Sequence, residues 1–328
     1  MHHVTGHDAG GKSVFLSTDI GDHHRKLVNK SAIANILYST NQHPVDHNGG
    51  VDIKYTRQNE RNNTMANKII LVTGATAGIG YETVKAFTRS SNSYHIFLGS
   101  RSQKKGDEAL QKLQAECQGA TNTVEVLQID VSSDESIEKA FEVVKNSKGR
   151  LDVLVNNAGA GFDTEFVQGK ISLRECFNRA YDVNVSGANV VTWTFIPLLL
   201  KSTQPRLLFV AGLSQMTQAA ESYFPTPPQP AGWPKKIDFE TIGYRCSKTA
   251  LSMLMLDWNH KLKEDGIKVF SVSPGFCATG LGGIAEDAWK AMGAGPPSEG
   301  GEKIIAVAEG HRDADAGKII DKVGFIPW

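Results

Sequence analysis

Short apolar runs alternate with helix-length amphipathic stretches from Lys68 to the end of the chain, and this pattern restricts the fold more than any other feature. The apolar runs cover residues 69–72, 96–98, 124–129, 153–155, 207–210 and 269–272, with a weaker run at 319–325. Continuous apolar runs of this length are typical of strands buried on both faces. Strand–helix–strand repetition predicts right-handed crossovers and an α/β fold, a doubly wound parallel sheet in a single domain.

Helical periodicity occupies the segments between these runs. It covers residues 81–91, 103–116, 134–148, 173–200 and 244–263. The last segment places one apolar stripe at helical spacing, formed by Leu251, Leu254, Met255, Trp258 and Leu262. Ligands of open parallel sheets bind beyond the carboxyl ends of the strands, so we expect the functional residues there.

The first 66 residues differ from the rest of the chain. They lack sustained periodicity and hold seven of the ten histidines. We predict a disordered N-terminal extension over residues 1–66, followed by one domain over residues 67–328. Met65 lies just before the first strand and is a candidate natural start, and a metal-binding or targeting role for the extension stays open.

Composition excludes several classes of protein. Lys plus Arg and Asp plus Glu are 35 each, which favours neither nucleic acid nor a membrane surface as partner. The four cysteines are scattered, without a C-x-x-C pair, as is typical of reduced thiols in a cytoplasmic protein. No apolar run reaches the ~20 residues needed to cross a bilayer. No metal site is predicted.

A glycine-rich loop directly follows the first predicted strand. It reads Thr73-Gly74-Ala75-Thr76-Ala77-Gly78-Ile79-Gly80. Glycines let the backbone approach a pyrophosphate, and the N-terminus of the following helix offers free N–H groups and a positive dipole end. A loop of this kind between a strand and a helix predicts dinucleotide binding.

The second predicted strand indicates which dinucleotide binds. It ends in Ser100-Arg101, and no acidic residue lies between Ser90 and Arg101 to bind a ribose 2′-hydroxyl. An arginine can hold the 2′-phosphate of NADP instead. Asp130-Val131 follows the third strand, where the adenine is expected, and Asn156-Asn157-Ala158-Gly159 follows the fourth, where amide side chains can hold the loop against the cofactor.

These residues resemble the short-chain dehydrogenase/reductase family, and the resemblance covers residues 68–328. It extends to Tyr244-Arg245-Cys246-Ser247-Lys248 as Y-x-x-x-K, to Asn184, and to Pro274-Gly275 with Thr279. The resemblance implies a Rossmann-type fold, NADP(H) as cofactor and a carbonyl reductase. It also implies that Lys248 holds the nicotinamide ribose, that Asn184 positions Lys248 through water, and that Thr279 meets the nicotinamide amide or the phosphates.

Tyr244 and Lys248 are four residues apart, so they share one face of a predicted helix. A carbonyl that accepts hydride needs a proton on its oxygen, and tyrosine, with a pKa of about 10, can supply it. A neighbouring ammonium, together with the positive nicotinamide of the oxidised cofactor, is expected to lower that pKa.

The chain departs from the family where a serine should orient the substrate carbonyl. Ala211 and Gly212 stand at the expected positions, and Ser214 is the nearest hydroxyl, with Thr217 as a second candidate. Two alternatives to a reductase therefore stay open. One is a catalytically silent protein that binds the cofactor or acts as a scaffold, and the other is a dehydratase or epimerase on the same scaffold.

An insert of 29 residues separates Ser214 from Tyr244 and is rich in proline. Proline excludes regular helix, which predicts a stiff loop beside the site. The resemblance implies a dimer or tetramer, but some monomeric carbonyl reductases carry an insert at this place that obstructs the usual helix-to-helix assembly, so a monomer or a homodimer stays open. Four large apolar residues near the site favour a small apolar or aromatic carbonyl or alcohol substrate, although they could equally pack the loops: Trp233, Phe276, Leu281 and Trp289.

Overall fold

The computed structural model describes residues 67–328 except 212–215, 222, 224–227 and 323, together with four short strands among the first 66 residues. These strands form two antiparallel pairs, β1 (His2–His7) with β2 (Ser13–Asp19) and β3 (His24–Lys26) with β4 (Ile33–Asn35). The chain divides into two compact units, Met1–Ala66 and Asn67–Trp328. The predicted disorder of residues 1–66 stays a prediction, and the candidate site lies in the second unit.

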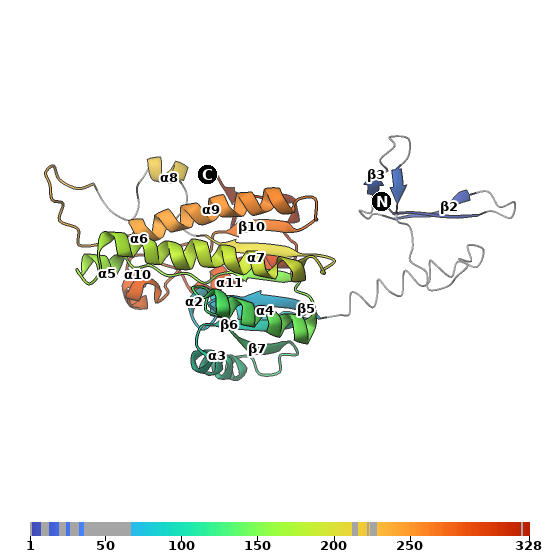
Figure 1. Cartoon of the computed structure of the whole chain (residues 1–328), viewed down its shortest axis with the longest axis horizontal. Coiled ribbons are helices and arrows are strands. Elements are labelled where there is room, and N and C mark those ends of the chain that lie inside the picture. Colours follow the sequence, from blue (N-terminus) through green and yellow to red (C-terminus); the bar gives the residue numbers. More distant parts are fainter. Residues whose placement is uncertain are drawn as a thin grey trace. The chain divides into compact units, whose positions relative to one another are not determined.

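An eight-stranded sheet forms the centre of the second unit, in the order β12-β11-β10-β9-β8-β5-β6-β7 (Figure 1). Its strands are β5 (Lys68–Val72), β6 (Tyr94–Ser100), β7 (Thr123–Gln128), β8 (Val153–Asn156), β9 (Arg206–Val210), β10 (Lys268–Val272), β11 (Ile319–Asp321) and β12 (Gly324–Ile326). All neighbours are parallel except β11 and β12, which are antiparallel. The strand order reverses at β5, between β6 and β8, which is the switch point where such sheets bind ligands.

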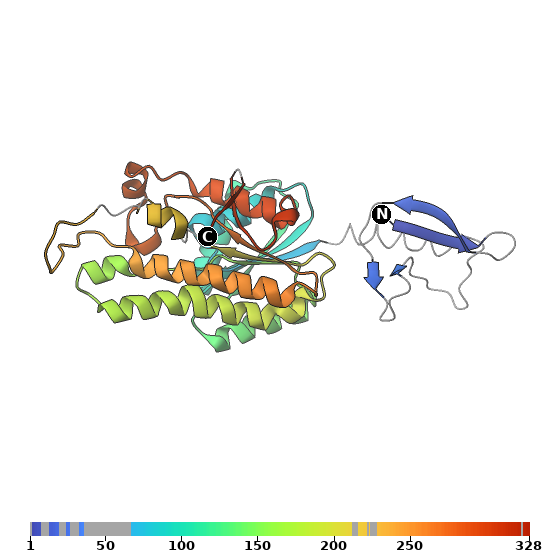
Figure 2. The same ribbon diagram turned by 90° about the horizontal axis from the view of Figure 1, so that it is seen from above.

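Helices cover both faces of this sheet (Figure 2). One layer contains α2 (Gly78–Arg89), α3 (Gln103–Glu116) and α11 (Pro297–Ala308), and the other contains α4 (Asp134–Lys148), α7 (Ala188–Leu199) and α9 (Ile242–Leu262). Ahead of α7, α6 (Leu173–Tyr181) continues through a π-helical turn, η1 (Asp182–Gly187). Shorter helices lie in the loops: α5 (Asp163–Val167), α8 (Met216–Glu221), η2 (Leu281–Gly283), α10 (Glu286–Ala291) and η3 (Asp313–Asp315).

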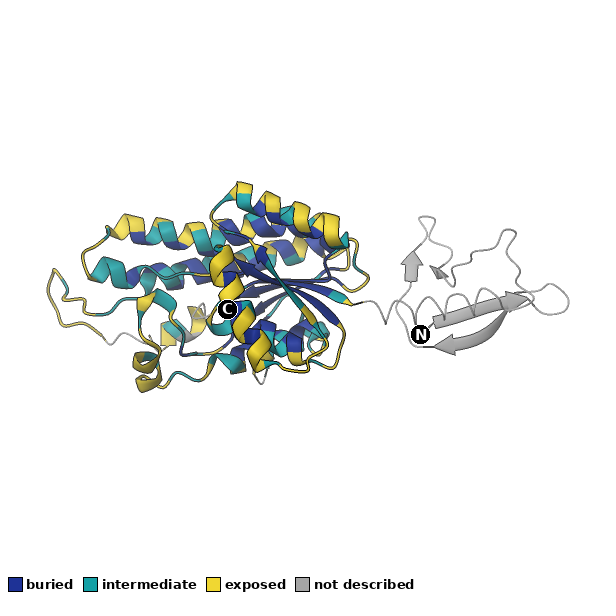
Figure 3. Ribbon diagram, turned by 90° about the horizontal axis from the view of Figure 1, so that it is seen from below, coloured by how far each residue is buried: buried dark blue, intermediate teal, exposed yellow. Residues whose placement is uncertain are grey.

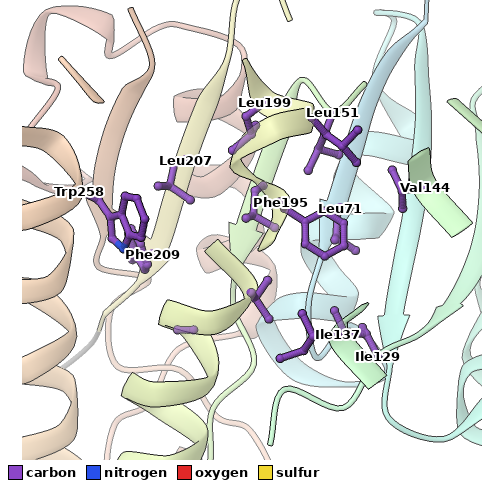
Figure 4. Packing of buried hydrophobic residues seen from close by; sticks show 14 of the residues in the cluster. Leu71, Ile129, Ile137, Val144, Leu151, Phe195, Leu199, Leu207, Phe209 and Trp258 are labelled. Carbon is purple, nitrogen blue, oxygen red and sulfur yellow. The ribbon is translucent and has the colours of Figure 1, made fainter. Parts of the chain in front are cut away.

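The core consists of two apolar clusters, one on each face of the sheet. Ile69 and Leu71 of β5 belong to one cluster and Ile70 and Val72 to the other, because successive side chains of a strand point to opposite faces. All four are buried, and the strands form the dark centre of Figure 3. Figure 4 shows Phe195 of α7 packed beside Leu71. Burial on both faces explains why the strands read as continuous apolar runs.

Local sequence defines the ends of the helices, as α4 illustrates. The hydroxyl of Ser133 accepts a hydrogen bond of 3.3 Å from the N–H of Ser136 and caps the first turn. Asp134 and Glu135 lie at the positive end of the helix dipole. Gly149 ends the helix in the left-handed region with φ of 72°, a conformation that glycine adopts without a steric penalty.

The doubly wound parallel sheet expected from the sequence is confirmed, and each apolar run lies within a strand or overlaps one. Two features differ from the expectation. The last run forms an antiparallel pair, β11 and β12, rather than one strand. The segment 297–308, which showed no helical pattern, forms α11. Within the described residues, none of the helices has the length and apolar character needed to span a membrane.

Candidate active site

The glycine-rich loop joins β5 to α2 at the switch point of the sheet. Gly74 and Gly78 have positive φ values of 64° and 56°, which side chains rarely tolerate. A Cβ at Gly74 would lie 2.8 Å from the Cα of Ala158, so the loop also needs glycine for space. No side chain caps the N-terminus of α2 at Ala77. The first turn of this helix therefore offers the uncapped N–H groups and the dipole that a pyrophosphate requires.

Hydrogen bonds around Thr73 join the glycine-rich loop to the loop that follows β8. The N–H groups of Asn157 and Ala158 donate to the hydroxyl of Thr73 at 3.1 and 3.0 Å. In return, the side chain of Asn157 donates to the carbonyl oxygens of Thr73 and Gly74 at 2.9 and 3.1 Å. Asn157 thus holds the glycine-rich loop in place. Thr76, Ile79 and Gly80 complete this loop, with Gly80 packed against Asn157.

Two residues at the end of β6, Ser100 and Arg101, differ in exposure and in hydrogen bonding. Ser100 is buried, and its hydroxyl donates to the carbonyl oxygen of Ser102 at 2.8 Å, so it stabilises its own turn. Arg101 is exposed and has no ion pair among the described residues. Its guanidinium is therefore the group of this pair that fits a 2′-phosphate. Asp130 accepts two hydrogen bonds from Ser132, and Val131 lies buried beside it.

Tyr244 and Lys248 lie one turn apart on α9. The ammonium of Lys248 lies 5.7 Å from the centre of the Tyr244 ring and donates to the carbonyl oxygen of Val210 at 2.9 Å. The ring of Tyr244 flanks Gly161, where a Cβ would lie 3.6 Å from its Cδ2. A Cβ at Gly159 would lie 3.2 Å from the ammonium nitrogen. The segment 159–161 therefore forms a wall of small residues against both side chains.

Burial dominates the protonation of this pair. It lowers the pKa of Lys248 to about 8 and raises the pKa of Tyr244 above its ordinary value, because each charged form loses solvation. Without the cofactor the pKa of the Tyr244 phenol is therefore raised. The lowering expected beside the ammonium and the oxidised nicotinamide stays a prediction. Desolvation is the cause of both shifts, and with a pKa of about 8 the ammonium of Lys248 is still charged at neutral pH.

Asn184 is fully buried in the π-helical turn η1 and connects two parts of the site. Its amide donates to the carbonyl oxygen of Ala160 and to the hydroxyl of Ser247, both at 2.8 Å, and its oxygen accepts from the N–H of Ala160 at 2.8 Å. Asn184 therefore holds the wall 159–161 against α9. Turns of this type in long helices are frequent at functional sites.

A cavity of about 410 Å³ opens beyond this wall. One side is formed by Gly159, Ala160 and Gly161 with four polar residues, Thr164, Glu165, Gln168 and Lys170, and the other by residues 280–283. Thr279 precedes the second side and packs close to Gly78, where a Cβ would lie 3.2 Å from its Cγ2. Pro274 and Gly275 begin the same segment after β10, and Pro274 is buried near Ile79 and Gly300.

The hydroxyl expected to orient a substrate is not placed by the structure, because Ser214 lies outside the described residues. Thr217 is exposed in α8, and both its N–H and its hydroxyl bond to the carbonyl oxygen of Trp328. Among the apolar candidates, only Leu281 lines the cavity. Trp289 instead packs on Phe276 at 5.7 Å and on Phe239 at 6.2 Å, and Trp233 is 85% exposed.

Sequence reasoning missed two residues that contact the site. Ser247 accepts from Asn184 and donates to the carbonyl oxygen of Tyr244 at 2.6 Å, and it lies within the Y-x-x-x-K segment itself. Asp163 is buried at the start of α5 and accepts from the N–H of Tyr244 at 3.1 Å. The acidic residues of Asp163-Thr164-Glu165 are typical of the first turn of a helix. No sequence pattern, however, indicates that Asp163 accepts a hydrogen bond from Tyr244, 81 residues away.

The fold and these residues together define a class, the dinucleotide-dependent oxidoreductases of the α/β type. Residues 68–223 match the short chain dehydrogenase family. The short-chain dehydrogenase/reductase tropE of Talaromyces stipitatus is 45% identical over 261 residues, which cover 79% of this chain and 97% of that protein. For eupG of Phoma sp. the identity is 42% over 271 residues, with the same coverage. The chain belongs to the short-chain dehydrogenase/reductase family, whose NAD(P)-dependent members interconvert carbonyl and alcohol groups.

Solved structures agree on the fold. An NADPH-bound carbonyl reductase from chicken fatty liver superposes with a TM-score of 0.63 at 23% identity, covering 80% of this chain and 99% of that one. A short part of the chain is similar to a protein of another kind. The cupin-domain-containing oxidoreductase fogC of Aspergillus ruber is 63% identical over 60 residues, 18% of this chain and 30% of that protein. So small a share of fogC carries no activity over to this chain.

Proposed function

We propose that the protein is an NADPH-dependent reductase of a ketone or aldehyde, or the reverse alcohol dehydrogenase, acting in the cavity beside Tyr244 and Lys248. The observation that carries the proposal is the placement of both side chains on one face of α9, against the wall 159–161 of that cavity. No other arrangement among the described residues combines a proton donor, a buried ammonium and a glycine-rich dinucleotide loop.

Tyr244 acts as the acid in the reduction. NADPH, when bound, supplies the hydride. The hydroxyl of Tyr244 donates its proton to the carbonyl oxygen as that oxygen gains negative charge. Burial favours the neutral phenol, which is the form that reduction requires. Lys248 then offsets the charge of the phenolate that is left, and this effect is strong because the ammonium is buried.

The loops at the switch point hold the cofactor. The loop of residues 73–80 and the first turn of α2 receive the pyrophosphate, and Asn157 keeps that loop in shape. The exposed guanidinium of Arg101 selects NADP by binding the 2′-phosphate, and Asp130 and Val131 border the adenine. Further cofactor contacts are proposed for Ser100, Ala158, Gly159, Tyr244, Lys248, Pro274, Gly275 and Thr279.

The cavity lining favours a carbonyl compound that carries polar groups. Thr164, Gln168 and Lys170 present hydroxyl, amide and ammonium groups, and Lys170 is exposed without an ion pair among the described residues. Glu165 is instead paired with Arg179 at 2.9 Å. Polar groups in a pocket fix the orientation of a ligand. The apolar or aromatic substrate expected from the sequence stays a prediction, with Leu281 as its support.

The test measures NADPH oxidation by the full chain with quinones, diketones and aldehydes, with Tyr244→Phe as control. We expect turnover by the wild type and a loss of ~10²- to 10⁴-fold in the variant, the usual share of a general acid. NADPH binding, followed by fluorescence, should persist in both. Binding without turnover across the panel would indicate a silent protein. Conversion of an alcohol without net NADPH oxidation would indicate a dehydratase or epimerase.

A further inference from the structure

The N-terminus of α9 is held by two carboxylates from outside the helix. The first N–H groups of a helix have no intrahelical acceptor. The carboxylate of Glu240 accepts from Thr241 at 2.7 Å and from Ile242 at 3.0 Å. The carboxylate of Asp163 accepts from Gly243 at 2.7 Å and from Tyr244 at 3.1 Å, one oxygen for each N–H. The two carboxylates therefore satisfy all N–H groups ahead of the first intrahelical bond.

The helix provides no cap of its own at this end. Thr241 occupies the N-cap position, but its hydroxyl is buried and has no partner among the described residues. Gly243 instead leaves room for the distant carboxylate, because a Cβ there would lie 3.1 Å from Oδ1 of Asp163 and 2.9 Å from the sulfur of Cys176. The start of α9 is thus shaped to receive Asp163.

Asp163 also belongs to the substrate side of the site. It begins α5, directly after the loop that contains the wall 159–161, and the next two residues, Thr164 and Glu165, line the cavity. Its carboxylate therefore joins one side of the cavity to the backbone N–H of Tyr244 itself. Movement of α5 relative to α9 would displace the phenol from the wall that its ring flanks.

The charge of Asp163 has no counter-ion among the described residues, although the carboxylate is buried. The positive end of the α9 dipole and the two N–H groups compensate it instead. The neighbouring thiol of Cys176 stays neutral, since burial and then the carboxylate raise its pKa to about 11. Without its bonds to α9 the carboxylate would be a buried, unpaired charge, which makes this attachment strong and specific.

We propose that Asp163 is a positioning residue, whose carboxylate fixes Tyr244 relative to the wall 159–161 and the cavity. This inference rests on the proposed function, in which Tyr244 donates the proton. Misplacement of a reacting group by about 1 Å can cost ~100-fold in rate. Loss of Asp163 therefore lowers kcat while the cofactor loops, held by Asn157, keep their affinity for NADPH.

The test compares Asp163→Ala with Glu240→Ala in the full chain. Each removes the acceptor of two N–H groups at the same helix end, so both lower the melting temperature. We expect Asp163→Ala to lower kcat by ~10- to 100-fold, with KM for NADPH changed less than about twofold, and Glu240→Ala to keep kcat within about threefold. Equal losses of kcat in the two variants would mean helix capping alone, and would overturn the positioning role.

Asp163→Asn provides a milder variant in case the alanine variant does not fold. Its amide oxygen can accept one hydrogen bond, while its NH₂ group opposes the second N–H. We expect a loss of kcat in the same direction, and unchanged kcat would contradict the proposal. Amide hydrogen exchange at Gly243 and Tyr244 should rise in both variants without any substrate present. If the wild type reduced no carbonyl, the proposed function would fail, while the exchange would still decide whether Asp163 holds α9.

Discussion

Lys248 donates a hydrogen bond of 2.9 Å to the carbonyl oxygen of Val210, the last residue of β9. The side chain is buried, and burial lowers its pKa from 10.5 to about 8. At neutral pH the ammonium is still charged, so the folded protein carries its desolvation cost. A shift of about 2.5 units corresponds to roughly 3 kcal/mol, at 1.36 per unit.

Lys248→Met is expected to stabilise the protein and to inactivate it. Methionine has a similar length and no charge to desolvate, although the bond to Val210 is lost. We predict a melting temperature a few degrees higher at pH 7, measured calorimetrically without cofactor, together with a loss of turnover of at least ~10²-fold. A lower melting temperature would show that the ammonium stabilises the fold.

The pH dependence of stability tests whether the higher melting temperature of Lys248→Met comes from the lost charge of Lys248. Between pH 8 and 10 the folded protein binds fewer protons at Lys248 than the unfolded chain, so the free energy of unfolding of the wild type should rise relative to that of Lys248→Met. Below pH 8 both states carry the charge, and the difference should be constant. Chemical denaturation at a series of pH values measures this difference. A constant difference from pH 6 to 10 would contradict the assignment.

Arg101→Ala is expected to remove the proposed preference for NADPH over NADH. A charge-assisted hydrogen bond contributes about 1.5–3 kcal/mol, so KM for NADPH should rise ~10- to 100-fold while KM for NADH changes little. Arg174→Ala on α6 serves as control, since it removes the same charge from another exposed position. An equal rise for both cofactors in steady-state assays would show that Arg101 does not read the 2′-phosphate.

Ser214→Ala and Thr217→Ala separate the two candidates for the substrate hydroxyl. Thr217 already bonds to Trp328, so its loss should leave kcat nearly unchanged. Ser214→Ala should lower turnover at saturating NADPH by ~10-fold or more, as loss of a hydrogen bond made in the transition state would. Unchanged turnover of the Ser214 variant would contradict this role of Ser214, and Tyr244 alone would then orient the carbonyl.

A chain that starts at Met65 should keep full activity. The proposed site lies within Asn67–Trp328, and the cut keeps Asn67, whose carbonyl oxygen accepts from Arg150 at 2.9 Å. We expect kcat/KM and the melting temperature to match those of the full chain. A start at Ile70 removes Asn67 and part of β5, and should lower the melting temperature. A large loss of activity from the first cut would give residues 1–64 a part in function.

The strands and the loops that follow them were readable from the sequence because each depends on a few neighbouring residues. Helix α11 was not predicted, and its Gly300 and Gly301 have low helix propensity. The structure gives the reason for these glycines: a Cβ at Gly301 would lie 2.7 Å from the backbone of Glu82 in α2, and one at Gly300 would lie 2.9 Å from Pro274. The helix depends on close packing rather than on its own propensity.

The role of Asp163 also depends on contacts between distant segments, so it could not be predicted from the sequence. Its hydrogen bonds to Gly243 and Tyr244 span about 80 residues of chain, and no local pattern encodes them. The raised pKa of Tyr244 was not predictable for the same reason, because the spacing places an ammonium four residues away but does not show the burial that raises this pKa. Pairings within one segment were predictable, whereas pairings between segments required the folded chain.

The parallel sheet has a kinetic consequence. Gly78 contacts Thr279 across about 200 residues of chain, and Asn184 bonds to Ser247 across 63. Each such pairing closes a long loop before it gains any contact energy, so parallel sheets form slowly. The residues of the proposed site come from segments far apart in the chain, the loop after β5, the turn η1 and helix α9, so the site is complete only once these segments have packed together. We therefore expect enzymatic activity to return only at the end of refolding, together with the last cooperative step.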